Sequence, residues 1–180
     1  MPLPTFRYHP DPLRSGSIIT STSPCICCDQ SRGYVYAASI YSEHDLLEEA
    51  ICPWCIADAT AHKMFRAYFV DDEGMDHAVP TPAHDEIVFR TPGFATWQSE
   101  RWLACCDDAM AFLEPIGTTE LRRYYPELEG TLMMYIVHEL ELSGDAANHL
   151  LNSLNRDTGP TAYVFRCLHC EALKGYIDFL

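Results

Sequence analysis

Positive charge is scarce in this sequence. Only 12 lysines and arginines stand against 26 aspartates and glutamates, which gives a formal net charge of -14. Nucleic-acid-binding proteins draw much of their affinity from basic side chains that neutralise phosphates. The charge balance therefore argues against a general role in binding DNA or RNA. It is compatible with plain solubility, and it favours association with a partner that has a basic surface.

Long apolar runs are missing as well. No stretch of about 18 or more apolar residues occurs, so the sequence predicts no membrane span. The N-terminal residues MPLPTFRYHP lack the basic and apolar segments of a secretory signal, and we expect a cytosolic protein. The chain has 180 residues, 48% of them apolar, which is enough for a sizeable core. We expect a single domain over residues 1–180, because no long linker of Gly, Ser or Pro divides it.

The common catalytic patterns are absent too. The sequence contains no H-E-x-x-H, no G-x-S-x-G, no phosphate-binding loop and no dinucleotide fingerprint. A zinc deaminase needs H-x-E upstream of P-C-x-x-C, and only the second half occurs, at Pro24 and Cys25. We therefore expect a protein that is not an enzyme.

Cysteine, by contrast, is abundant. The nine cysteines form four clusters, C-I-C-C at 25–28, C-P-W-C at 52–55, C-C at 105–106 and C-L-H-C at 167–170. Without a secretory signal, cysteines grouped in this way indicate metal rather than disulfides. A Cys-x-x-Cys turn aims both sulfurs at one point about 2.3 Å from a zinc ion, and two such turns complete a tetrahedron. The first predicted structural zinc site therefore comprises Cys25, Cys28, Cys52 and Cys55. Cys27 is the spare cysteine, although it could replace Cys25.

The segments around these cysteines suggest a small zinc module over residues 1–70. Residues 33–42 are rich in aromatic and β-branched side chains and predict a strand, residues 43–51 have a helical pattern, and residues 56–65 predict a helix. The C-P-W-C quartet could alternatively be a redox-active pair. A thioredoxin-like motif follows an apolar strand, however, and an acidic segment precedes this one.

A second zinc module is predicted over residues 94–180. Cys167 and Cys170 lie between two predicted strands, and the remaining cysteines are Cys105 and Cys106. Because adjacent cysteines share one metal only with strain, we expect Cys106, Cys167 and Cys170 to bind, with Cys105, a nitrogen or a water completing the set. His169 is expected to be a bystander. A metal-free group of core cysteines is the alternative.

An acidic segment and two helical segments complete the chain. Residues 71–92 predict a loop that ends in a short strand at 87–90, and residues 127–142 and 146–154 predict helices. Trp97 and Trp102 could form an exposed pair or belong to the core. The acidic segment could bind a cation or remain simply solvated. As the surface for a basic partner we predict Asp71, Asp72, Glu73, Asp76, Asp85 and Glu86.

Several motifs taken together resemble the CbrC family, a bacterial group named for a colicin-tolerance phenotype. They are C-I-C-C-D-Q, E-E-A-I-C-P-W-C-I-A-D, R-T-P-G-F-A-T-W-Q, W-L-A-C-C-D-D-A-M-A-F-L and Y-V-F-R-C-L-H-C. The resemblance covers nearly the whole chain and implies a paired-cysteine zinc protein. The family's third motif, H-C-x-D-x-C, would require a cysteine at Met110. Since a thioether is a poor zinc ligand, the second site would then depend on Cys105.

These observations lead to one expected fold and two expected functions. The fold is α+β, with small antiparallel hairpins of zinc-ribbon type around one or two structural zinc ions and about four packed helices. The first function is that of a non-enzymatic protein-binding factor. The tolerance phenotype implies an immunity role in which the acidic chain neutralises a toxin, such as a basic nuclease domain. The second is a zinc-dependent hydrolase with an open metal position at the second cysteine site.

Overall fold

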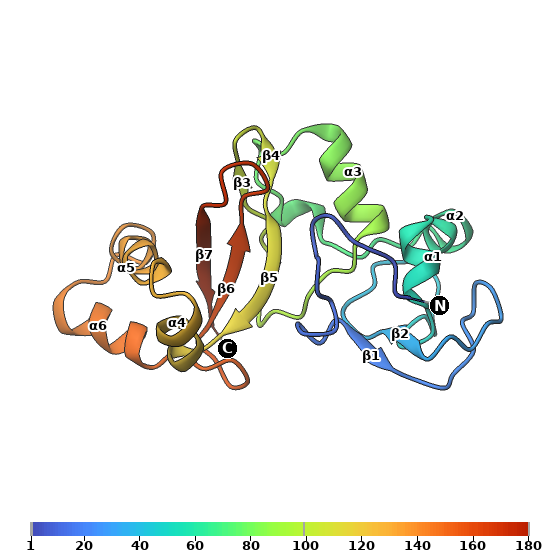
Figure 1. Cartoon of the computed structure of the whole chain (residues 1–180), viewed down its shortest axis with the longest axis horizontal. Coiled ribbons are helices and arrows are strands. Elements are labelled where there is room, and N and C mark those ends of the chain that lie inside the picture. The colour runs from blue at the N-terminus through green and yellow to red at the C-terminus, as the bar shows by residue number, and fades with distance from the viewer. Residues whose placement is uncertain (1, 99, 180) are drawn as a thin grey trace.

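A three-stranded antiparallel sheet organises the C-terminal half of the chain. The computed structural model describes residues 2–98 and 100–179 (Figure 1). The sheet has the order β5-β6-β7, formed by β5 (Ala111–Ile116), β6 (Thr161–Arg166) and β7 (Leu173–Asp178). Strand β6 lies in the middle and has five buried residues in a row. Such a continuous apolar strand is expected where both faces of a sheet are covered.

The two faces of this sheet support two different cores. Val164 packs with α4 (Thr118–Tyr124), α5 (Leu128–His138) and α6 (Gly144–Asn152). Its neighbours Tyr163 and Phe165 point the other way, because side chains alternate along a strand, and they pack against α3 (Thr81–Arg90). Figure 1 shows the corresponding layers, with α4, α5 and α6 on one side of the sheet and α3 on the other.

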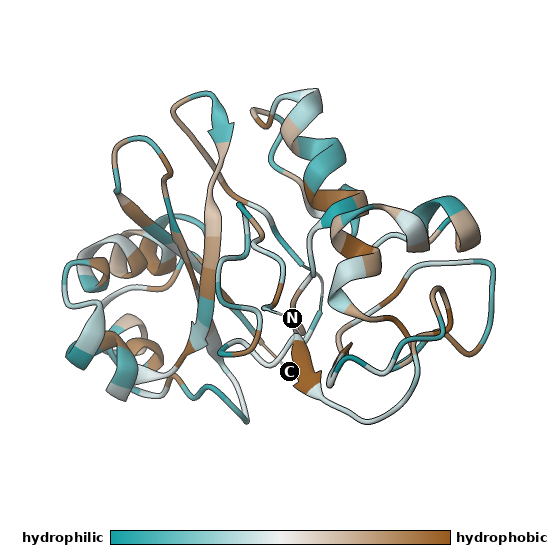
Figure 2. Ribbon diagram, turned by 45° about the vertical axis from the view of Figure 1, so that its right-hand side comes forward, coloured by the Kyte–Doolittle hydropathy of each residue, from teal (hydrophilic) through white to brown (hydrophobic). Residues whose placement is uncertain are grey.

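The N-terminal half contains a small hairpin and short helices around a third core. Strands β1 (Ile18–Thr20) and β2 (Tyr34–Tyr36) pair antiparallel, and α1 (Pro53–Ala57) and α2 (Thr60–Phe65) pack beside them. A short 3-10 helix, η1 (Asp72–Gly74), leads to α3. A second hairpin, β3 (Ala104–Cys105) and β4 (Asp108–Ala109), precedes the large sheet. Figure 2, coloured by hydropathy, shows that β1 is largely apolar (brown). Hydrophilic residues (teal) lie mainly on loops and on the outer parts of the helices.

The expected fold class is confirmed, since small antiparallel sheets and packed helices form a mixed α+β structure that holds two four-cysteine clusters. The described residues contain six α-helices rather than about four. None of the helices in residues 2–98 and 100–179 is both long and apolar enough to cross a membrane.

The strand predicted at 87–90 is wrong, because these residues form the end of α3. Their β-branched side chains suggested a strand, but a proline in the first helical turn favours a helix start, since it lacks the N–H that a helix leaves unpaired there. Ala83, Ile87 and Val88 are buried at helical spacing, and this apolar face holds the segment against the core.

Three other predicted segments also need correction. Residues 43–51 form bends and turns instead of a helix, and both Leu46 and Glu49 have positive φ values, 69° and 50°. The helix expected at 56–65 is interrupted at Ala59, whose φ of 61° separates α1 from α2. The strand expected at 33–42 covers only β2. The tryptophans do not form an exposed pair, because Trp102 is buried while Trp97 is partly exposed.

Candidate metal centres

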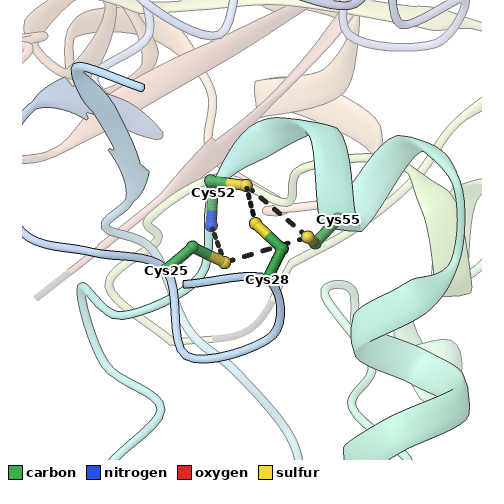
Figure 3. Close-up of side chains that lie close together, drawn as sticks. All are labelled: Cys25, Cys28, Cys52 and Cys55. Atoms are coloured by element: carbon green, nitrogen blue, oxygen red, sulfur yellow. Dashed lines mark hydrogen bonds between the residues drawn. The ribbon is translucent and has the colours of Figure 1, made fainter. Parts of the chain in front are cut away.

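The first cluster brings together the sulfur atoms of Cys25, Cys28, Cys52 and Cys55 (Figure 3). All four sulfurs lie within 4.8 Å of one another. The distances are 3.8 Å from Cys25 to Cys55, 3.9 Å from Cys28 to Cys52 and 3.6 Å from Cys52 to Cys55. A tetrahedron with metal–sulfur bonds of about 2.3 Å has edges of about 3.8 Å, so the cluster fits a tetrahedral metal ion.

Two backbone turns position these sulfurs. The amides of Cys28 and Asp29 both donate to the carbonyl of Cys25, at 3.3 and 2.8 Å, and Asp29 adopts a left-handed φ of 53° that closes the turn. Cys52 stands at the N-terminal cap of α1, and Cys55 follows in the first helical turn. The amide of Cys52 donates to the sulfur of Cys25 at 3.2 Å, which ties the two turns together.

The electrostatics of this cluster is compatible with a bound cation. Hydrogen bonds from Cys27 and then Cys52 hold the pKa of the Cys25 thiol far below its usual range. Burial raises the pKa of Cys55 to about 12, since a second thiolate beside Cys25 would be desolvated and repelled. A divalent cation bound here would compensate this repulsion and favour the thiolate form of its ligands. Cys27 is half-buried against the surrounding core and lies outside the four-sulfur group.

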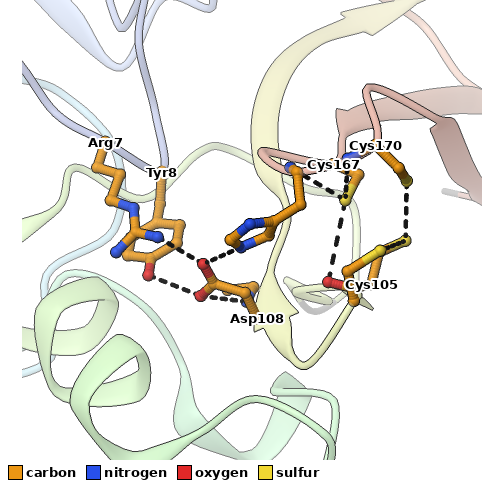
Figure 4. Close-up of polar contacts among 9 residues, drawn as sticks. Arg7, Tyr8, Cys105, Asp108, Cys167 and Cys170 are labelled. Atoms are coloured by element: carbon orange, nitrogen blue, oxygen red, sulfur yellow. Dashed lines mark hydrogen bonds and ion pairs between the residues drawn. The ribbon is translucent and has the colours of Figure 1, made fainter.

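The second cluster joins Cys105, Cys106, Cys167 and Cys170 (Figure 4). The Cys105 sulfur lies 3.8 Å from the sulfurs of both Cys106 and Cys170. The backbone amides of His169 and Cys170 point at the sulfur of Cys167, at 3.4 and 3.5 Å. These contacts lower the pKa of the Cys167 thiol to about 6.

The two clusters differ in exposure. In the first, Cys25, Cys52 and Cys55 are buried, whereas in the second only Cys167 is buried and Cys106 and Cys170 are exposed. Met110, where the motif H-C-x-D-x-C would have its last cysteine, is fully buried in the core beside the sheet. The sulfur of Cys105 completes the second cluster in its place.

His169 points away from the second cluster. Its Nε2 lies 2.9 Å from Oδ2 of Asp108, which also accepts a hydrogen bond from Arg7 at 2.5 Å. The other oxygen of Asp108 accepts a hydrogen bond from Tyr8 at 2.9 Å (Figure 4). Sequence reasoning missed Arg7 and Tyr8, because no local signal links the N-terminal segment to a hairpin about 100 residues away.

The six acidic residues predicted for a partner surface do not line one common hollow. Asp71 and Asp72 border a hollow beside Tyr41, and Glu73 and Asp76 border another beside Trp102. Asp85 and Glu86 belong to α3 instead of a loop, and Glu86 pairs with Arg90 at 3.8 Å. In the described part of the chain, Asp71, Asp72, Glu73 and Asp76 make no ion pair with lysine or arginine.

Similarity to known proteins extends over almost the whole chain. UPF0167 proteins of Mycobacterium bovis and Mycobacterium tuberculosis are each 41% identical over 178 residues, covering 98% of this chain and 94% of the relative. One of Pseudomonas aeruginosa is 41% identical over 179 residues, covering 99% and 98%. No solved structure matches. The model of an uncharacterised protein family, UPF0167, matches residues 3–179, and the chain belongs to this family.

Proposed function

We propose that the eight clustered cysteines hold two structural zinc ions. The support is the donor set, since four thiolates at tetrahedral spacing suit zinc and fill its coordination. Each cluster connects segments far apart in the sequence, residues 25–28 to 52–55 and residues 105–106 to 167–170. Zinc would therefore fasten the N-terminal hairpin to α1 and the β3–β4 hairpin to the large sheet. The proposal assumes a reducing cytosol, where thiolates persist.

The proposed role of this scaffold is to bind another protein without catalysing a reaction. The observation that carries it is a set of carboxylates in and beside η1, Asp71, Asp72, Glu73 and Asp76, which have no lysine or arginine partner among the described residues. By contrast, the buried carboxylate of Glu114 is compensated by Arg14 and Arg156. Uncompensated charge of one sign on a chain with a net charge of -14 attracts a basic partner.

For the partner we propose a basic toxin domain. The resemblance to CbrC proteins, with their colicin-tolerance phenotype, suggests that this chain acts as an immunity or tolerance factor. Carboxylates can cover the basic surface with which a nuclease holds phosphates, so binding alone would block such a toxin. This mechanism requires no catalytic group on the chain.

Co-expression with the product of the neighbouring open reading frame tests this role. We expect that product to be a basic protein that stops growth of a bacterial host alone, and that growth returns when the present chain is co-expressed. The two proteins should co-purify, and the complex should weaken as salt rises, because screening reduces attraction between exposed charges. A neighbouring product that is neither toxic nor bound would contradict the toxin role.

The alternative of a zinc-dependent hydrolase depends on the second cluster. The support for this alternative is a hollow of about 300 Å³ whose lining includes Cys106, Asp108 and His169. A catalytic zinc keeps one coordination position for water, however, and four cysteine ligands would occupy all four positions. Cobalt substitution separates the two functions. Four-thiolate absorption at both sites supports the scaffold, and a site with an exchangeable water supports the hydrolase.

A further inference from the structure

A hollow of about 250 Å³ lies between η1, α3 and the segments that contain Tyr41 and Tyr68. The two tyrosines are held side by side by backbone hydrogen bonds in both directions, at 3.0 and 2.8 Å. The residues that matter for its chemistry are Tyr41, Tyr68, Phe89, Asp71, Asp72 and His84. The hollow therefore combines aromatic walls with an acidic rim, and neither metal cluster contributes to it.

The aromatic walls present ring surface to solvent. Tyr41 is 37% exposed and Tyr68 is 41% exposed, although both are large side chains next to a core. The rings of Tyr68 and Phe89 have centroids 5.7 Å apart and are inclined at 55°. A cation placed against the face of such a ring is attracted by the negative potential of its π system. The hollow thus offers more than apolar contact.

The acidic rim adds carboxylates that form no ion pair with lysine or arginine among the described residues. Asp71 and Asp72 have no lysine or arginine partner in the described residues, and His84 faces Asp85 at 3.4 Å. The carboxyl of Glu100 holds the amide of Asp71 at 3.3 Å. Burial, followed by the charges of Glu100 and Asp71, raises the pKa of the Tyr41 phenol to about 12. Burial disfavours charge of either sign at Tyr41, whereas the carboxylate of Asp71 adds a negative field that favours a cation there.

We infer that this hollow receives an arginine side chain of the basic partner. A planar guanidinium can stack on the rings of Tyr41 or Tyr68 and still donate two hydrogen bonds to the carboxylate of Asp72. A lysine ammonium is a compact, strongly hydrated charge that matches this combination less well. The inference deepens the proposed function and rests on it only for the identity of the partner, because arginine recognition can be measured alone.

The test uses the full chain with zinc and the peptide acetyl-Gly-Arg-Gly-amide as the probe. Binding is followed by amide and aromatic NMR shifts, and the matched control peptide carries citrulline, which has the same shape without the charge. We expect shifts at Tyr41, Tyr68 and Asp72 with the arginine peptide and weaker binding by about fivefold or more with citrulline. Equal shifts with both peptides, or shifts only elsewhere, would overturn the inference.

Two variants and a control assign the binding to this hollow. Tyr68→Leu keeps an apolar side chain but removes the π face, and Asp72→Asn removes one charge at a similar size. Each should weaken binding of the arginine peptide about fivefold. Glu127→Gln removes an equal charge from an exposed position before α5, whose side chain caps no helix amide, and should leave binding unchanged. If Glu127→Gln weakened binding of the arginine peptide equally, the effect would come from net charge alone, and this result would contradict a specific site in the hollow.

Failure of arginine recognition by the hollow can be distinguished from failure of the proposed toxin-binding function. If Tyr68→Leu and Asp72→Asn lose the arginine peptide but still protect against the toxic partner, the hollow binds arginine outside that interface, and the partner assignment is overturned. If the variants bind the peptide as the natural sequence does, arginine recognition by this hollow is overturned, whatever co-expression shows about toxin tolerance.

Discussion

The sulfur atoms of Cys105 and Cys106 lie 3.8 Å apart, although neighbouring side chains on a strand normally point to opposite faces. The reason is that Cys106 and Asp107 form the two-residue turn of the β3–β4 hairpin, with φ values of 54° and 57°. Positive φ at both central positions is typical of a type I′ turn, which suits the twist of paired strands. Two adjacent cysteines can therefore serve one tetrahedral site.

The two proposed zinc ions should leave the protein at different rates. A chelator reaches the exposed sulfurs of Cys106 and Cys170 more easily than the buried sulfurs of the first cluster. We expect two zinc ions per chain by elemental analysis, and a biphasic release with a fast and a slow ion when a colorimetric chelator is added. Release of both ions in a single phase, or a protein purified under reducing conditions without zinc, would contradict this expectation.

Substitution of one cysteine in the first cluster should be far more damaging than substitution of its neighbour. Cys25→Ser removes a ligand from a structural site whose metal can contribute about 10–16 kcal/mol of apparent binding free energy, more than most domains have as net stability. We expect this variant to retain one zinc ion and to lose the N-terminal hairpin from its NMR spectrum.

Cys27→Ser is the matched control, because Cys27 lies outside the four-sulfur group. It should keep two zinc ions and lose about 1 kcal/mol or less. Equal loss of zinc in both variants would mean that Cys27 takes part in the site.

His169→Asn should leave zinc bound at the second cluster. The imidazole contacts Asp108 instead of the sulfur group, and half of the side chain is exposed, so the lost contact should cost about 1 kcal/mol or less. Elemental analysis should still give two zinc ions per chain, and the cobalt-substituted variant should keep the absorption of a four-thiolate site. Loss of one metal ion would identify His169 as a ligand.

Glu100 should make the protein less stable as the pH rises. Burial raises the pKa of this carboxyl to about 8 from its ordinary value of 4.5, in surroundings that also include Asp71, Tyr36, Tyr41 and Tyr176. Between these two pH values the unfolded chain has released the proton while the folded chain retains it. Stability therefore falls with rising pH, by at most about 1.4 kcal/mol per pH unit for this group.

Glu100→Gln removes this contribution and still offers an oxygen to the amide of Asp71. Urea unfolding at several pH values, with zinc present, should show that the variant gains stability over the natural sequence as the pH rises from about 5 to 8. A difference between the two proteins that does not change with pH would show that Glu100 ionises normally.

Much of the cysteine arrangement could be predicted from local spacing. Cys-x-x-Cys forms a turn within four residues, so the pairs Cys25 with Cys28 and Cys167 with Cys170 indicate possible metal-binding sites without any knowledge of the fold. The strands on either side of Cys167 could also be predicted, because aromatic and β-branched residues are enriched in strands. Secondary structure was predicted less well where the side chains were ambiguous. The β-branched residues at 87–90 suggested a strand, and packing against the core instead made them the buried face of α3.

By itself the sequence determined the α+β class, the four short cysteine clusters and the acidic charge, since these follow from local spacing and composition. Only the tertiary structure decided that Cys105 joins the second cluster, that Asp108 meets Arg7 and Tyr8, and that Tyr41, Tyr68 and Asp72 border one hollow. The physical reason is that these contacts connect residues far apart along the chain, or depend on a turn with positive φ at Cys106 and Asp107. Burial of the three cores fixes such contacts, and no short segment encodes them.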